Sequence, residues 1–72
     1  MIGFLKWLKR NPLQAVMLNS ICVEYSVPPH KYVFKNVDIS EQDAIDIDFL
    51  VFYLAKEVEN AELEKNNGAS NN

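Results

Sequence analysis

The clearest pattern in this 72-residue sequence is a long helical segment with apolar residues on two opposite faces. Spacings of three and four residues alternate along the first stripe, which is the pattern of a helix-packing seam. The seam consists of Ala44, Ile47, Val51, Leu54, Val58 and Ala61. The second stripe lies nearly opposite on a helical wheel and consists of Ile45, Phe49, Phe52, Tyr53 and Leu63. Because each apolar face has to be buried, we expect this helix to be covered on both sides.

The sequence also predicts where this helix begins and ends. Ser40 is suited to cap its start, and Glu41 and Asp43 place negative charge in the first turn, where the helix dipole favours it. We expect the helix to end near Lys65, because Gly68 opens a polar stretch. The sequence therefore predicts a single interaction domain over residues 1–65 and a disordered polar tail over residues 66–72.

Two shorter helices are predicted at the N-terminus. The first is amphipathic, with Phe4, Leu5, Trp7 and Leu8 on one arc. A basic face lies opposite and consists of Lys6, Lys9 and Arg10. Asn11 followed by Pro12 indicates the start of a second helix, with Asn11 as its cap and proline in the first turn.

Residues 21–37 carry mixed signals for helix and strand. Residues 21–27 alternate apolar and polar positions, Pro28 and Pro29 interrupt the chain, and residues 31–37 are rich in residues that favour strands. An isolated hairpin is marginal in water. We therefore predict a mainly α domain with two short N-terminal helices, a short extended segment and one long C-terminal helix. An α+β fold with a β-hairpin at residues 21–37 is the alternative.

The small size of the chain predicts self-association. A domain of this length buries only about 60% of the surface that its unfolded chain exposes. The single cysteine, Cys22, excludes an internal disulfide, and no zinc-type spacing is present. The N-terminal segments can cover one stripe of the long helix, so a second molecule is expected on the other. We predict a homo-oligomer, although the sequence decides neither its size nor which stripe is core.

Charge is divided between the two halves of the chain. Residues 1–37 hold five basic residues against one acidic residue, a balance of +4, and residues 38–72 hold two against nine, a balance of −7. Such asymmetry indicates an interaction surface. On the long helix, acidic edges flank the second stripe, and together they predict a partner-binding surface. This surface consists of Asp46, Asp48, Phe49, Phe52, Tyr53, Glu57 and Glu59.

No motif in the sequence indicates an enzyme, a cofactor or a metal site. His30 is the only histidine, and Cys22 lies in an apolar stretch typical of a buried thiol. The two glycines lie near the chain ends and form no phosphate-binding loop. Three basic residues on an acidic protein are too few to predict direct binding to nucleic acid.

These patterns favour a small, non-enzymatic regulatory protein that binds another protein. A basic partner, for example a DNA-binding repressor sequestered by an antirepressor or inhibitor, would match the acidic helix. One alternative is a peripheral membrane protein anchored by the N-terminal amphipathic helix. Another is a structural subunit of a larger assembly. The longest apolar run is too short to span a bilayer and no signal-peptide pattern is present, so we expect a cytoplasmic protein.

Overall fold

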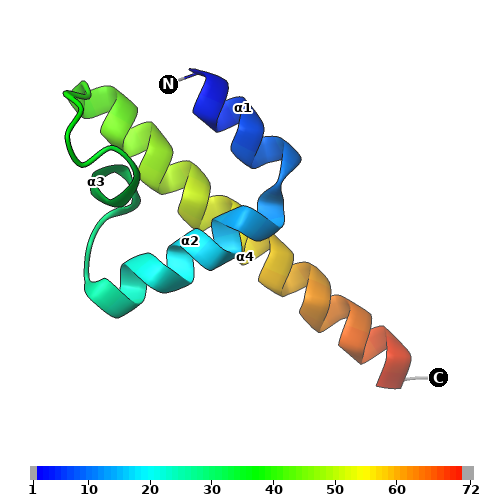
Figure 1. The fold of residues 1–72 in the computed structure, drawn as a ribbon. Coiled ribbons are helices and arrows are strands. Elements are labelled where there is room, and N and C mark those ends of the chain that lie inside the picture. Colours follow the sequence, from blue (N-terminus) through cyan, green and yellow to red (C-terminus); the bar gives the residue numbers. More distant parts are fainter. Residues whose placement is uncertain (1, 71–72) are drawn as a thin grey trace.

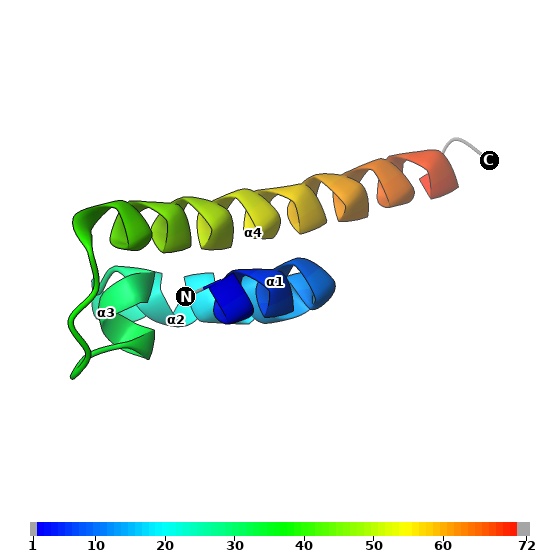
Figure 2. The ribbon, with the colours of Figure 1, turned by 90° about the horizontal axis from the view of Figure 1, so that it is seen from above.

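In the computed structural model the long C-terminal helix forms one layer and three shorter helices form the other. The structure describes residues 2–70, with side chains described as far as Lys65. The helices are α1 (Ile2–Arg10), α2 (Pro12–Tyr25), α3 (Pro29–Val33) and α4 (Glu41–Ser70). Figure 2 shows α1, α2 and α3 together on one side of α4, so the opposite side of α4 is left uncovered.

The mainly α fold class is confirmed, and no strand occurs between residues 2 and 70. In Figure 1, α1 runs beside the first half of α4, whereas α2 crosses α4 near its middle. The C-terminal half of α4 projects beyond this crossing. The projection explains the elongated outline of the chain, with extents of 51 × 25 × 15 Å.

The core lies between α4 and the layer formed by the shorter helices. Leu8 of α1, Ala15 of α2 and Ile47 and Val51 of α4 are fully buried in one cluster. Half-buried side chains complete the cluster, and they are Phe4, Leu5, Leu18, Phe34, Leu50 and Leu54. Burying an aliphatic side chain contributes about 1.5–3 kcal/mol. Because only four of the described side chains in this cluster are fully buried, each of them contributes a large part of the stability of the fold.

The predicted seam faces this core over most of its length. Ile47 and Val51 are fully buried, and Ala44, Leu54 and Val58 are half-buried. Ala61 is exposed, because α4 has passed its crossing with α2 before this position. The stripe that forms the core is therefore the seam, and the second stripe faces away from the other helices.

Asn11 joins α1 to α2 in a different way from the one predicted. It occupies the N-cap position of α2, but its side chain makes no cap hydrogen bond there. Its side-chain amide Nδ2 donates instead to the backbone oxygen of Trp7 at 2.9 Å. Asn11 therefore satisfies a free carbonyl at the end of α1, while Pro12 begins α2 without needing a donor.

The structure replaces the predicted extended segment by a helix and a turn. Residues 21–25 continue α2, which ends where Ser26 adopts a left-handed conformation with φ 54°. Residues 29–33 form α3, and a turn follows in which the Val37 N–H donates to the Phe34 oxygen. The β prediction for residues 31–37 and the hairpin alternative are therefore wrong. A lone extended segment leaves backbone groups unpaired, whereas a helix pairs them internally.

The start of α4 agrees with its prediction. The Ser40 hydroxyl oxygen accepts a hydrogen bond from the Asp43 backbone N–H at 3.1 Å, as an N-cap does. The helix continues to Ser70, which is farther than the end expected near Lys65. The disordered tail over residues 66–72 stays a prediction, and residues 71–72 lie outside the described part of the chain.

Candidate functional site: an exposed aromatic face on α4

The uncovered side of α4 carries four large apolar side chains, which we name the aromatic face: Ile45, Phe49, Phe52 and Tyr53. Phe49 is 68% exposed and Phe52 is 65% exposed. The rings of Phe49 and Tyr53, one helical turn apart, stack with their centroids 6.0 Å apart. Covering a large apolar side chain gains about 1.5–3 kcal/mol, so these residues hold binding free energy that the fold itself does not use.

One acidic edge of the aromatic face is formed by Asp46 and Glu57. The Asp46 carboxylate accepts a hydrogen bond from the Gln42 amide at 3.0 Å, which keeps Asp46 on the helix surface. Glu57 lies one turn after Tyr53 on α4. Its carboxylate raises the pKa of Tyr53, first by hydrogen bonding to the hydroxyl and then by its negative charge, and burial acts in the same direction. The edge therefore presents carboxylates directly beside an exposed aromatic ring.

The other acidic edge of the aromatic face consists of Asp48, which is half-buried, and Glu59, which is exposed. The carboxylate of Asp48 lies 2.8 Å from His30 Nδ1 and accepts the His30 backbone N–H at 2.9 Å. No other contact between a basic and an acidic side chain lies within salt-bridge distance among residues 2–65. Asp48 therefore holds α3 against α4, and we leave it out of the binding surface. Glu59 is exposed and lies farther along α4.

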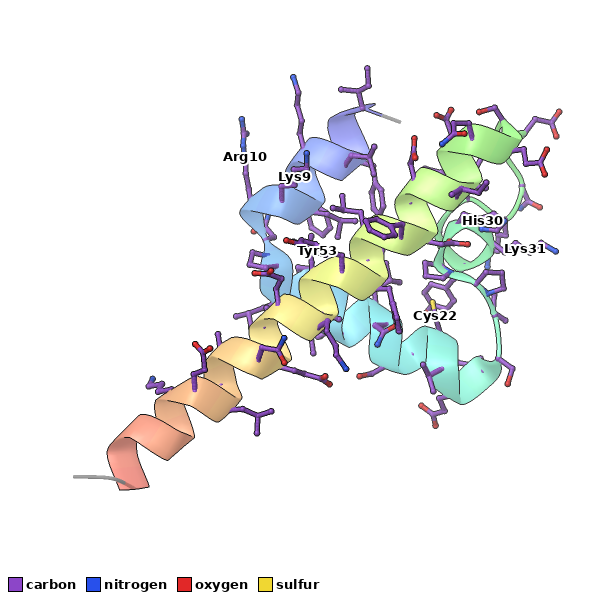
Figure 3. The ribbon with its side chains drawn as sticks, turned by 180° about the vertical axis from the view of Figure 1, so that it is seen from behind. Lys9, Arg10, Cys22, His30, Lys31 and Tyr53 are labelled. Carbon is purple, nitrogen blue, oxygen red and sulfur yellow. The ribbon has the colours of Figure 1, made fainter. Side chains whose placement is uncertain are left out.

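Cys22 and His30 lie near Asp48 but do not form an activated thiol. Cys22 is only 4% exposed, and its pKa is raised by burial and then by the negative charge of Asp48. Figure 3 shows Cys22 on α2 and His30 on α3, both on the side of α4 that faces the core. Reactive cysteines have lowered pKa values, so this environment favours an inert thiol.

The basic face of α1 forms no salt bridge with the side chains that the structure describes. Lys6, Lys9 and Arg10 are exposed, and none of them reaches a carboxylate among residues 2–65. In Figure 3, Lys9 and Arg10 extend from α1 away from α4. The acidic edges of α4 are therefore not neutralised by the basic residues of the same copy.

The structure also contains an apolar notch that sequence patterns do not predict. The notch lies where α2 begins and α4 leaves the body of the molecule, and it has a volume of about 500 Å³. It is lined by Leu13, Val16, Val58, Glu59, Glu62 and Leu63. Leu63, which was predicted to share a stripe with Phe49, is 60% exposed and also lines this notch. Only the crossing of α2 and α4 brings these residues together, so no local signal could have identified them.

A second, larger groove lies between α3 and the start of α4. Its volume is about 710 Å³, and its lining mixes Lys31 and Lys35 with Asp38, Glu41 and Asp48. Over residues 2–70 no three potential metal ligands are grouped together. Within that same range, every helix is too short or too polar to cross a membrane. Because basic and acidic residues both line the groove, it favours neither an acidic nor a basic ligand, whereas the edges of the aromatic face are acidic.

Comparison of the chain with protein-family models, curated proteins and solved structures found no match. The most distinctive feature of its surface is the aromatic face with its acidic edges.

Proposed function

We propose that this chain is a small, non-enzymatic regulatory protein that binds another protein through the aromatic face of α4. The observation that carries the proposal is the exposure of Phe49 and Phe52 on the same uncovered side of one helix. Large aromatic side chains dominate the affinity of protein interfaces when a partner covers them. A helix that presents such side chains at spacings of three and four residues fits an apolar groove on a partner.

The charge around this face specifies the partner further. Asp46 and Glu57 flank the aromatic side chains, and the described part of α4 carries eight acidic residues against Lys56 and Lys65. A partner surface that combines an apolar groove with lysine or arginine would be complementary to it. DNA-binding proteins carry such surfaces, because they neutralise phosphates. A repressor or related DNA-binding protein, sequestered by this helix, is the partner that this chemistry favours.

Anchoring to a membrane through α1 has less support. The apolar arc that would enter the bilayer includes Leu8, which is fully buried, and Phe4 and Leu5, which pack against the core. Ile2 and Trp7 remain exposed beside the basic face. Most of the apolar surface of α1 is therefore already used by the fold.

Affinity capture followed by kinetics tests this proposal. The tagged wild-type chain should retain a host protein that a Phe49→Ala/Phe52→Ala variant does not retain. The matched control is Val23→Ala/Tyr25→Ala, which removes two equally exposed apolar side chains from α2. With the purified partner, the Phe49 and Phe52 substitutions should mainly accelerate dissociation. Asp46→Lys/Glu57→Lys should slow association and reduce its dependence on salt.

The DNA-binding character of the partner has its own test. DNA carrying the binding site of that partner should compete with this chain for the partner, and a scrambled duplex should compete less. If the Phe49→Ala/Phe52→Ala variant retains the same proteins as the wild type, the aromatic face is not the binding surface. If DNA and the chain bind the partner together without interference, sequestration is the wrong mechanism.

A further inference from the structure

The notch between α2 and α4 is another apolar surface that the fold leaves open. Leu13 is 65% exposed and Leu63 is 60% exposed, and they face the notch from different helices. Glu59 and Glu62 lie among the apolar lining residues. The occupant of the notch should therefore combine an apolar side chain with positive charge, since a carboxylate beside an apolar surface disfavours an acidic neighbour.

The chain exposes more surface than a compact monomer of its mass. Its accessible surface area is 5543 Å², whereas a compact monomer of 8.3 kDa is expected to expose about 4,600 Å². The elongated outline accounts for this difference, because the C-terminal half of α4 projects beyond its crossing with α2.

The chain itself contains an element with the required chemistry. On α1, Ile2 is 70% exposed, and Lys6 and Lys9 follow it at helical spacing on the outer side. These lysines reach no carboxylate of their own copy among residues 2–65. We propose that two copies of this chain form a dimer in which the basic outer face of α1 from each copy occupies the notch of the other.

In this arrangement Ile2 enters the apolar notch, and Lys6 and Lys9 pair with Glu59 and Glu62 of the second copy. Each copy offers both a basic α1 and an acidic notch, so a twofold exchange satisfies both surfaces and closes the assembly. The aromatic side chains and the edge formed by Asp46 and Glu57 are not part of this contact, which shares only Glu59 with the other acidic edge. Dimer formation and binding of a regulatory partner are therefore separable, and either can fail without the other.

Charge reversal tests the pairing directly. Wild-type protein at about 100 µM should sediment with twice the chain mass of 8.3 kDa. Lys6→Glu/Lys9→Glu and Glu59→Lys/Glu62→Lys should each raise the dimer dissociation constant by more than about tenfold. The variant that carries all four substitutions should recover dimer formation, because the pairing is restored with its signs exchanged. Added salt should weaken the wild-type dimer.

Matched controls separate this contact from a general effect of charge. Lys35→Glu and Glu24→Lys change exposed residues outside both surfaces, and they should leave the dissociation constant unchanged. Circular dichroism should show equal helical content in all variants, since every substituted residue is exposed. A wild-type chain that stays monomeric at about 100 µM would overturn the proposal. The proposal would also be overturned if the charge reversals left the dimer intact and the Phe49→Ala/Phe52→Ala variant dissociated it.

Discussion

The two carboxylate oxygens of Asp48 both contact His30: Oδ1 accepts the His30 backbone N–H at 2.9 Å, and Oδ2 lies 2.8 Å from the ring atom Nδ1. Pro28 and Pro29 precede His30 and have no N–H, so His30 supplies the first backbone donor of α3. A negative charge at a helix start is favourable, and here it comes from a different helix. Asp48 therefore fixes the short helix α3, which is too short to be stable alone, against α4.

Removing this clamp should destabilise the fold. Asp48→Ala leaves a half-buried donor without its acceptor, which costs about 1–3 kcal/mol of unfolding free energy. His30→Ala should cost less, because the backbone N–H still reaches Asp48. Urea unfolding followed by circular dichroism measures both changes. Asp46→Ala is the control, because Asp46 bonds only to the exposed Gln42 among the described residues. Equal losses for Asp46→Ala and Asp48→Ala would show that the clamp contributes little.

The two faces of α4 should respond in opposite ways to the same substitution. Val51 is fully buried beside Leu8 and Ile47, so Val51→Asp places an unpaired charge in the core. We expect a loss of about 3 kcal/mol or more, or an unfolded chain. Phe52→Asp changes a side chain that is 65% exposed, and its melting temperature should stay within about three degrees of wild type. Similar melting temperatures for the two variants would mean that the seam is not the core.

The features predicted correctly from the sequence are those that depend on neighbouring residues. The spacing of Ile47 and Val51 placed them on one face of a helix, and Ser40 marked its start, because both signals act within a few residues. The helical spacing of Lys6, Lys9 and Arg10 likewise placed them on one face of α1, and all three are exposed. The choice of the seam as core needed the structure, since both stripes of α4 are apolar enough to be buried.

The incorrect predictions concern segments whose conformation depends on distant partners. Residues 31–37 have strand propensity, but among the described residues no second strand is available to pair with them, so α3 and a turn form instead. The cap of α3 by Asp48 joins residues 18 positions apart. The meeting of Leu13 and Leu63 depends on where α2 crosses α4. Such contacts depend on tertiary packing, so no periodic pattern in the sequence predicts them.

Cys22 should react slowly in the folded chain. It is 4% exposed, and its raised pKa keeps it as the unreactive thiol. Iodoacetamide at about pH 8 should therefore modify the native chain more than about tenfold more slowly than the chain unfolded in urea. Equal rates would indicate that α2 opens readily away from α4.

The same thiol should make stability depend on pH in the alkaline range. The folded chain binds the Cys22 proton more tightly than the unfolded chain does, because burial and then Asp48 raise the folded-state pKa. This contribution is fully present below the ordinary value of 9.0 and is lost as the pH rises through the folded-state pKa. Relative to Cys22→Ala, the wild type should therefore lose unfolding free energy above pH 9.0. A difference that stays constant with pH would contradict the buried thiol.

Tyr53 provides a spectroscopic probe of the acidic edge. Its pKa is raised above the ordinary value of 10.0, first by the hydrogen bond with Glu57 and then by the charge of that carboxylate. Glu57→Gln removes the charge and weakens the hydrogen bond, so the pKa of Tyr53 should fall toward 10.0. Chain labelled with ¹³C at the tyrosine ring carbon that bears the hydroxyl allows Tyr53 to be titrated separately from Tyr25 and Tyr32 by NMR, with Tyr53→Phe assigning the signal.

Glu59→Gln is the control for this titration, because Glu59 lies on the other edge of α4 and makes no hydrogen bond with Tyr53. It should leave the Tyr53 titration unchanged. If Glu57→Gln and Glu59→Gln shift Tyr53 equally, the general negative charge of α4 raises the pKa and the specific contact does not. If only Glu57→Gln shifts it, Glu57 is held beside the aromatic face in solution. A basic partner that binds there would then contact both Glu57 and Tyr53, and its binding would change the NMR signal of Tyr53.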